Sequence, residues 1–314
     1  MSMSVLRTAD AWWVLADGGA IKVDTPAVTT AELLADRAAV AAAPAARSAP
    51  AVALDRLSLV SPVTTPCRVV AQMTNFASHV TDTGGDPAKV PLTFFRKASG
   101  SIAGPSGDIV RPAHVRLLDY EVEIGVVIGA ELPVGATVTA GDLDVLIAGL
   151  VVANDVSARD VQLPQTQFYE AKSYPTFTPC GPALVLLDPG EVRRFTDLRL
   201  RLLVNGRPRQ DMTAADMIYT PLQALQSLAR FQRLDAGDLL LTGTPSGTAL
   251  SAPPRPVQLL AALLPDHVKW RMFVRGQARN PNYLQDGDVI EASVATDDHA
   301  IDLGTQHTIV RYAR

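Results

Sequence analysis

The sequence predicts an α+β protein in which strands dominate. From Cys67 onward, short apolar runs are separated by glycines and prolines, and few stretches suit a long helix. Strand-like and helix-like runs do not alternate regularly, which argues against a doubly wound fold. Asn205-Gly206 stands between two strand-like runs and is the strongest short hairpin signal in the chain. We therefore expect a β-dominated domain with few helices.

The first 65 residues are expected to form a small α/β unit ahead of a larger domain over residues 66–314. Two short strand-like runs around a Gly-Gly turn predict a hairpin within residues 11–23. An alanine-rich stretch near residues 31–43 predicts a helix, which Pro44 should end.

In the larger domain, apolar runs bounded by turn residues predict a series of strands. We expect them at residues 68–71, 117–128, 146–153, 198–204, 238–242 and 288–292. Residues 221–231 show the spacing of an amphipathic helix.

The amino-acid composition argues against several classes of protein. Hydrophobic residues make up 47% of the 314-residue chain, so a sizeable core can form. The net charge of −4 argues against nucleic-acid binding, which usually goes with a basic excess. No apolar run is long enough to span a bilayer, and the N-terminus lacks the pattern of a signal peptide. The two cysteines match neither a disulfide framework nor a zinc site. We expect a cytoplasmic protein.

Glu121 and Glu123 provide the most informative local pattern. They open an apolar run, and alternate side chains of a strand point to the same face. Two buried carboxylates on one face repel each other unless a proton or a cation lies between them. A divalent cation that prefers oxygen ligands, such as Mg²⁺ or Mn²⁺, would meet this need. Taken alone, the pattern also fits a half-buried strand whose two glutamates face water.

His79 and Asp82 are the candidates for acid–base chemistry. They are three positions apart, so one helical turn would make them neighbours. A carboxylate beside an imidazole orients the ring and makes it a better base, which suits activation of a water molecule. A helix-surface pair without function is an equal alternative.

Three further segments carry polar residues next to apolar runs. Asp155 follows an apolar strand, where it could bind a metal or cap a short helix, and Arg159 and Gln162 after it could be solvated. Lys172 lies in an irregular loop among aromatics and prolines, where it could stabilise an oxyanion or remain at the surface. The glycine-rich turn at residues 242–248 could hold a carboxylate through its N–H groups and hydroxyls, or be a plain turn.

Together and in this order, these segments resemble the fumarylacetoacetate hydrolase family. The motifs that match are Tyr120-Glu121-Val122-Glu123, the segment from Asp155 to Asp160, the loop from Lys172 to Pro182, the turn from Thr242 to Pro245, and the element from His79 to Asp82. Five motifs in register over roughly 180 residues make a chance match hard to obtain.

The resemblance implies a catalytic domain folded as a distorted β-roll, in a homodimer with one Mg²⁺ or Mn²⁺ per subunit. It also implies substrates with a 2-oxo-acid or 1,3-dicarbonyl group. Members of the family hydrolyse C–C bonds of acylpyruvates, decarboxylate oxaloacetate, or isomerise and hydrate ring-cleavage products of aromatic catabolism.

Carried over by motif, the resemblance assigns the metal to Glu121, Glu123 and Asp155. It assigns the base that activates water to His79, oriented by Asp82. The leading hypothesis is therefore a magnesium-dependent hydrolase that cleaves a C–C bond in an acylpyruvate or related 2,4-dioxo acid. A decarboxylase, isomerase or hydratase acting on 2-oxo diacids is an alternative, and a non-catalytic ligand-binding protein on the same scaffold is another.

The remaining roles complete this hypothesis. Lys172 and Gln162 are expected to stabilise the oxyanion, and Arg159 and Thr244 to bind the substrate. The sequence also departs from the family, since an extra segment near residues 250–283 interrupts the C-terminal part and carries a basic cluster. That cluster is expected to be a solvated face, although it could also cover a dimer partner or attract an acidic substrate.

Two further departures lie around the predicted base. Phe76 replaces a tyrosine of the family, which removes a phenol that could contact substrate, and Asp82 replaces the longer glutamate.

Overall fold

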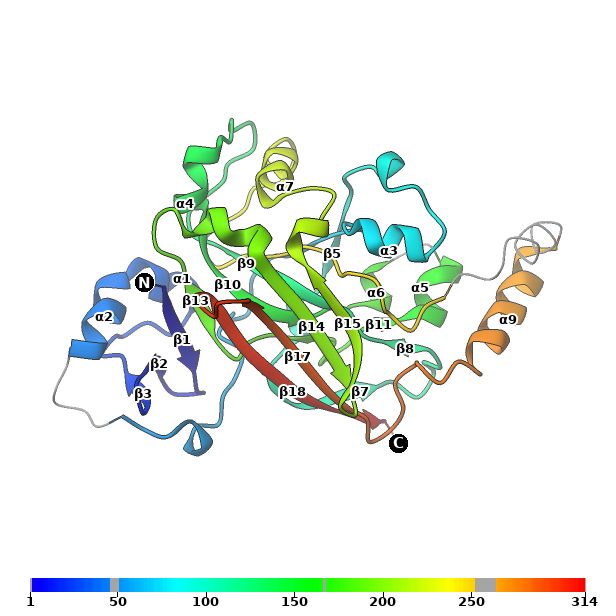
Figure 1. Ribbon diagram of the computed structural model, residues 1–314, viewed down its shortest axis with the longest axis horizontal. Helices are drawn as coiled ribbons and strands as arrows, with labels where there is room; N and C mark the ends of the chain where they lie inside the picture. The colour runs from blue at the N-terminus through cyan, green and yellow to red at the C-terminus, as the bar shows by residue number, and fades with distance from the viewer. Residues whose placement is uncertain (1, 46–50, 166–167, 252–263, 314) are drawn as a thin grey trace.

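Two β-sheets form the body of the protein (Figure 1). The structure is a computed structural model that describes residues 2–45, 51–165, 168–251 and 264–313. The larger sheet has nine strands, in the order β3 (Gly19–Lys22), β2 (Trp12–Ala16), β1 (Met3–Arg7), β13 (Leu184–Leu186), β10 (Ile147–Asn154), β9 (Val122–Ile128), β16 (Leu239–Leu241), β4 (Val69–Gln72) and β5 (Phe94–Lys97).

The smaller sheet has five strands and packs against the centre of the larger one. Its order is β15 (Arg207–Thr213), β14 (Leu198–Val204), β17 (Val289–Thr296), β18 (Asp302–Tyr312) and β7 (Ser106–Arg111). Two strand pairs stand apart from these sheets, β8 (Leu118–Asp119) with β11 (Ser157–Ala158), and β6 (Ile102–Ala103) with β12 (Thr178–Pro179).

Short helices surround the sheets, so the predicted β-dominated architecture is confirmed. They are α1 (Thr30–Ala35), α2 (Arg37–Ala42), α3 (Ala77–Asp82), α4 (Leu143–Leu146), α5 (Arg159–Gln165), α6 (Phe168–Ala171), α7 (Pro221–Leu228) and α9 (Asp266–Gln277). Within the described ranges, no helix combines the length and the apolar character needed to cross a membrane.

The alternation of side chains along β9 decides where the functional residues lie. Ile124 and Val126 pack in the core that includes Leu200 of β14, so these positions face the smaller sheet. Val127 belongs to a second core on the other face. Because strand side chains alternate, Glu123 shares the face of Val127.

The N-terminal strands extend the larger sheet. β1 pairs with β13, with Met3 opposite Leu186 and Val5 opposite Leu184. The predicted hairpin is confirmed as β2 and β3. The predicted division into domains at residue 65 stays a prediction.

The helix predicted near residues 31–43 is divided in two. Thr29 begins α1 with a capping box, because its side chain accepts from the N–H of Glu32 and the Glu32 carboxylate accepts from the N–H of Thr29. The break falls at Asp36, whose carboxylate accepts a hydrogen bond of 2.6 Å from Thr25. A side-chain contact of this kind is invisible to periodicity.

The predicted hairpin at Asn205-Gly206 is confirmed between β14 and β15. Both residues have left-handed φ angles, 53° and 71°, as a two-residue type I′ turn requires. The strand predicted over residues 117–128 is instead interrupted after Asp119, where side chains replace backbone partners. The N–H of Glu121 donates to the side-chain oxygen of Asn154, at 2.9 Å.

The segment predicted as an insertion is only partly described. Residues 252–263, which include Arg255 of the predicted basic cluster, lie outside the described residues. The described remainder forms α9, which has no buried residue and lies at the opposite end of the molecule from β1 (Figure 1). Solvation of the basic side chains on this helix agrees with the expectation for that cluster.

Candidate metal centre

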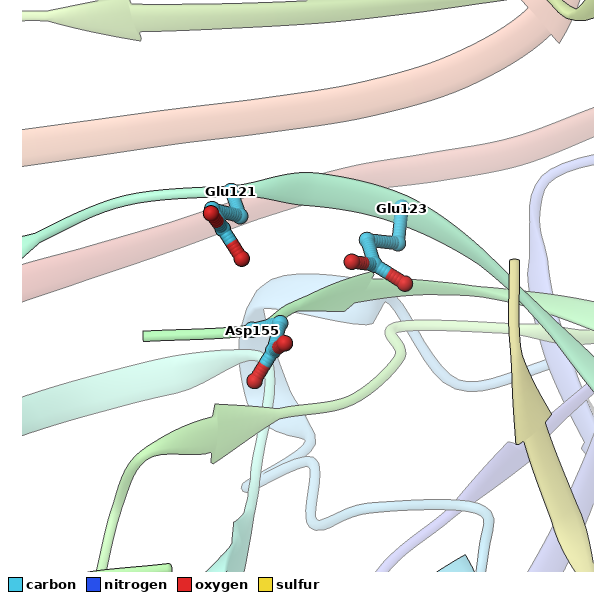
Figure 2. Close-up of side chains that lie close together, drawn as sticks. All are labelled: Glu121, Glu123 and Asp155. Atoms are coloured by element: carbon cyan, nitrogen blue, oxygen red, sulfur yellow. The ribbon is translucent and has the colours of Figure 1, made fainter. Parts of the chain in front are cut away.

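Two neighbouring strands bring three carboxylates together. Glu121 precedes β9, Glu123 lies within β9, and Asp155 follows the end of β10. The antiparallel register places Ala153 opposite Glu123, and the N–H of Asp155 donates to the carbonyl of Glu121 at 2.8 Å. One oxygen from each carboxylate lies within 4.8 Å of the others, and all three residues are buried. Figure 2 shows the two glutamates on one side of the β9 chain, with Asp155 below them.

The three carboxylates line a cavity of about 190 Å³. Its walls come from four regions of the chain, namely the β4–α3 segment, strand β5, the α5–α6 segment and the segment after β16. The sequence-predicted residues that line it together with the carboxylates are His79, Arg159, Gln162, Lys172 and Thr244.

Glu121 is surrounded by cationic groups. The ammonium of Lys172 and the guanidinium of Arg159 both donate to its carboxylate. Burial alone would raise the pKa of Glu121, but the charges of Arg159 and Lys172 outweigh burial and hold that pKa well below its usual range. Glu121 is therefore ionised at neutral pH.

Glu123 has the opposite environment. Its carboxylate accepts a hydrogen bond from the N–H of Gly243, at 2.8 Å, and among the described residues no side-chain cation pairs with it. Burial and the charges of Asp155 and Glu121 raise the pKa of Glu123 well above its ordinary value. A carboxyl group in this state requires either a proton or an additional cation.

Two lysines hold Asp155. Lys172 bridges Asp155 and Glu121, and the burial that lowers its pKa is outweighed by these two carboxylates, so the pKa of Lys172 is raised. Lys97, at the end of β5, also donates to Asp155 and donates to the carbonyl of Phe177 at 2.9 Å. Burial lowers the pKa of Lys97, against the opposing effect of Asp155.

The charge balance of this cluster fits a divalent cation. The buried ionisable side chains are Asp119, Glu121, Glu123, Asp155, Lys97, Arg159 and Lys172. With Glu123 protonated the cluster is neutral, and with Glu123 ionised it carries one excess negative charge. A divalent cation would change this to one excess positive charge and would suit an anionic ligand. The atoms that would bind the cation are carboxylate oxygens, which hard divalent cations prefer as ligands.

His79 reaches the cavity, but Asp82 does not join it there. The Nδ1 atom of His79 is buried without a hydrogen-bond partner, and burial lowers the pKa of the imidazole. Asp82 is exposed on α3, and no hydrogen bond joins it to His79 within the described residues. The structure therefore does not place the two in the orienting pair that the sequence suggested. The shorter aspartate offers less reach than a glutamate would.

Arg159 and Gln162 are linked to each other and to the carboxylates. Besides Glu121, Arg159 donates through Nε to Asp119 at 2.8 Å and through Nη1 to the side-chain oxygen of Gln162 at 2.9 Å. Since a guanidinium only donates, it fixes which end of the Gln162 amide faces Arg159. The NH₂ group of Gln162 is left to donate to a ligand. Both residues are buried, contrary to the alternative that they are solvated.

The turn after β16 hydrogen-bonds one of the three carboxylates directly. Its Gly243 N–H binds Glu123, so the turn does hold a carboxylate, although one from this chain. The hydroxyl of Thr244 donates to the carbonyl of Val122 at 2.9 Å and accepts from Gln210 at 2.8 Å. Because its one proton is already used, the Thr244 hydroxyl can accept from a ligand but not donate to one. The predicted substrate role of Thr244 stays a prediction.

Sequence reasoning missed Lys97 and Asp119 as parts of the site. Asp119 is fully buried and accepts hydrogen bonds from Arg159, from the N–H of Ala249 at 2.8 Å and from the N–H of Leu250 at 3.1 Å. Asp119, Glu121 and Glu123 are spaced by two residues, and this spacing was the available signal. Lys97 gave a weaker signal, a lysine at the end of a short strand-like run.

Comparison with known proteins identifies the same family as the motifs do. The family model described as fumarylacetoacetate (FAA) hydrolase C-terminal matches residues 68–311. The chain belongs to this family. The resemblance drawn from the sequence is thereby confirmed, and three motif segments of that resemblance contribute the carboxylates and Lys172 to one cavity.

Two relatives within the fumarylacetoacetate hydrolase family are named as oxaloacetate tautomerases. The mitochondrial oxaloacetate tautomerase Fahd2a of Rattus norvegicus is 34% identical over 206 residues, which span 65% of this chain and 64% of that protein. The match thus covers less than two thirds of the relative's length. A mitochondrial oxaloacetate tautomerase of Homo sapiens, FAHD2A, is 34% identical over 207 residues.

Solved structures extend the likeness over the whole chain. A probable 2-hydroxyhepta-2,4-diene-1,7-dioate isomerase of Mycobacterium abscessus has a TM-score of 0.75 and 28% identity, with full coverage of both chains. A fumarylacetoacetate hydrolase of Exiguobacterium antarcticum has a TM-score of 0.72 and 26% identity, covering 99% of this chain and all of that one. The predicted fold of the fumarylacetoacetate hydrolase type is therefore confirmed.

Proposed function

We propose that this protein is a divalent-metal-dependent enzyme that shifts a proton within a 2-oxo acid, as a keto–enol tautomerase or isomerase. The observation that carries the proposal is the arrangement of His79, a partly buried imidazole that lines the carboxylate cavity without an orienting carboxylate. A proton shift needs one neutral base next to an acidified C–H bond, whereas hydrolysis also needs a positioned water. The names of the two tautomerase relatives and of the isomerase structure support this choice, whereas one similar structure is named a hydrolase.

Glu121, Glu123 and Asp155 would hold the cation, and their oxygen ligands favour Mg²⁺ or Mn²⁺. When bound, the cation supplies positive charge to the 2-oxo and carboxylate oxygens of the substrate, which acidifies the neighbouring C–H bond. A site with one excess positive charge would also attract a diacid.

His79 would accept the proton from carbon and return it to oxygen. Its lowered pKa keeps the imidazole neutral at pH 7, the form that a base requires. The NH₂ group of Gln162 and the ammonium of Lys172 would donate toward the oxygen on which negative charge develops. Removal of one such donor typically costs about 3 kcal/mol of transition-state stabilisation.

Hydrolysis of a C–C bond in an acylpyruvate is the second candidate. The unpartnered Nδ1 of His79 and the cavity volume of about 190 Å³ favour it, because a water molecule could occupy the space beside the imidazole. The base would then act on water instead of on carbon. Asp82 takes no part in either version.

A single set of assays separates the two candidates. The protein with Mg²⁺ is incubated in D₂O with oxaloacetate, and exchange at the carbon next to the ketone is followed by NMR. Acylpyruvates and fumarylpyruvate are tested in parallel for cleavage, each with an EDTA control. Exchange without cleavage supports the tautomerase or isomerase, and cleavage of an acylpyruvate at a higher kcat/KM than exchange would refute it. Binding without turnover would favour the non-catalytic alternative.

Homodimer formation and a cytoplasmic location stay predictions. The two tautomerases described above are named as mitochondrial proteins, so the location of this chain is open to direct measurement by fractionation.

A further inference from the structure

Three buried, unpaired polar atoms belong to residues that line the carboxylate cavity. Among the described residues, seven buried side-chain nitrogen or oxygen atoms lack a hydrogen-bond partner. Three of the seven belong to residues that line this cavity, namely Nε2 and Oε1 of Gln72 and Nδ1 of His79. Buried polar groups are nearly always paired in native proteins, so a cluster of unpaired atoms at one cavity calls for a ligand.

Gln72 is the less expected member of this cluster. It ends β4 and is only 2% exposed, and both ends of its amide are unsatisfied. A buried glutamine without protein partners is unfavourable, since an apolar side chain of similar size would avoid the loss of hydration. The position therefore points to a role that packing does not provide.

Most of the other polar groups that line the cavity already have partners within the chain. Arg159 and Lys172 donate to carboxylates, the oxygen of Gln162 accepts from Arg159, and the hydroxyl of Thr244 has a donor and an acceptor of its own. Besides the NH₂ group of Gln162, Gln72 thus contributes an unpaired neutral donor and an unpaired neutral acceptor to the residues that line the cavity.

The sheet register places Gln72 beside the metal ligands. β4 runs parallel to β16 with Ala71 opposite Leu241, so the backbone of Gln72 lies next to the turn that begins at Thr242. The N–H of Gly243 in this turn binds Glu123. An oxygen atom of a ligand held next to Glu123 would lie on the Gln72 side of the cavity.

The segment between Gln72 and His79 is strained. Thr74 lines the cavity and has a left-handed φ of 54°, which is rare for a β-branched residue. Strain of this kind persists where the surrounding structure fixes the backbone, often at binding sites. It is consistent with a wall that is held in place to face a ligand.

We propose that Gln72 is a further substrate-binding residue, whose amide hydrogen-bonds the substrate oxygen that is a carbonyl in the keto form and a hydroxyl in the enol form. The inference rests on the proposed function and assigns it a specificity-determining contact. A carbonyl accepts from Nε2, and an enol hydroxyl donates to Oε1. One neutral amide can therefore hold both forms without a change of its own protonation.

The test uses Gln72→Met, which keeps the size of the side chain and removes both the donor and the acceptor. Oxalate serves as the probe, because it is a non-reacting analogue of an enolised 2-oxo acid and needs no turnover. Binding of oxalate in saturating Mg²⁺, and of Mg²⁺ alone, is measured by calorimetry. We expect Gln72→Met to weaken the binding of oxalate at least about tenfold and to leave the Mg²⁺ affinity unchanged. The kcat/KM for the 2-oxo acid should fall by a similar factor.

Gln306→Met is the matched control for stability. Gln306 is 1% exposed, but its Nε2 donates to the carbonyls of Val152 and Pro179, at 2.8 and 3.0 Å. This variant should lower Tm and, at a temperature where it is folded, bind oxalate as the wild type does. Gln72→Met should keep or raise Tm, since it removes an unsatisfied amide.

Two results would overturn the inference. Unchanged oxalate affinity in Gln72→Met would mean that the amide contacts only water in the cavity. An equal loss of Mg²⁺ affinity in the absence of oxalate would make Gln72 part of the cation site. Failure of the proposed function would look different. In that case the wild-type protein would bind oxalate with Mg²⁺ through Gln72 but would turn over no 2-oxo acid.

Discussion

Glu121 and Glu123 lie two positions apart and face the same cavity, yet their electrostatic environments are opposite. Two cationic side chains contact the Glu121 carboxylate and hold its pKa low. Glu123 has a single backbone N–H, and its pKa is raised. One carboxylate is stabilised as an anion by the chain itself, and the other requires a proton or an additional cation.

Substitution of the two glutamates should therefore affect the metal-free protein differently. Glu121→Gln leaves Lys172 and Arg159 without a full counter-charge, and we expect it to destabilise the fold by about 3 kcal/mol. Glu123→Gln removes a carboxyl that is unfavourable when ionised, so Tm in EDTA should stay the same or rise. Thermal unfolding of the two variants measures both changes in stability. Calorimetry should show that each variant binds Mg²⁺ more weakly than the wild type. Equal destabilisation by the two variants would contradict the assigned environments.

Asp155→Asn should weaken Mg²⁺ binding at least about tenfold. The substitution keeps the shape of the side chain, but it removes the charge that Lys97 and Lys172 contact and that a cation needs. Titration calorimetry measures the change. Asp142→Asn is the control, because Asp142 is an exposed capping residue that does not line the cavity. Wild-type affinity in Asp155→Asn would remove Asp155 from the ligand set.

The pH dependence of activity should follow the imidazole of His79. Its pKa is lowered by burial from an ordinary value near 6.5, so the neutral base is present throughout the neutral range. We expect kcat/KM at saturating Mg²⁺ to be level near pH 7 and to fall only as the pH drops below about 6.5. His79→Gln should lose activity and keep its Mg²⁺ affinity. If the residual activity of this variant still falls at low pH, the pH dependence is due to an ionisable group other than His79.

Asp82→Asn should change kcat/KM by less than about threefold, because an exposed carboxylate without a contact to His79 contributes little. Steady-state kinetics on the same substrate as for His79→Gln measure the difference. A loss as large as that of His79→Gln would restore the pair that the sequence suggested, formed on substrate binding.

Removal of the metal should lower stability reversibly. A ligand that binds only the folded protein stabilises it by about 2.7 kcal/mol at a free concentration of 100 times Kd. We expect EDTA to lower Tm and excess Mg²⁺ to restore it, and the size of the shift should shrink in Asp155→Asn. A Tm that does not respond to EDTA or Mg²⁺ in the wild type would argue against a resident cation.

Periodicity and turn chemistry were enough to predict much of the fold. Alternation placed Glu121 and Glu123 on one face, and Asn205-Gly206 predicted the hairpin. Interruptions were missed where a side chain takes over a backbone partner, as Asn154 does at Glu121. Such a contact joins residues that are distant in sequence, so no local pattern reports it.

The three carboxylates of the candidate metal centre were predicted from the sequence, as were Arg159 and Lys172, whereas Asp119 and Lys97 were not. The motif spacing identified Glu121, Glu123 and Asp155, and the structure brings them together. Lys97 could not be distinguished from a surface lysine, because its burial depends on the packing of β5. The expected pair of His79 and Asp82 rested on helical spacing alone, which does not set the direction of either side chain.

The pairing of β1 with β13 has a consequence for truncated forms of the protein. Residues Met3 to Val5 cover the hydrogen-bonding groups along one side of a strand of only three residues. If the first seven residues were deleted, those groups would be left without partners and could recruit strands from other molecules. A shortened chain would then be prone to aggregate even though every residue of the candidate metal centre were still present.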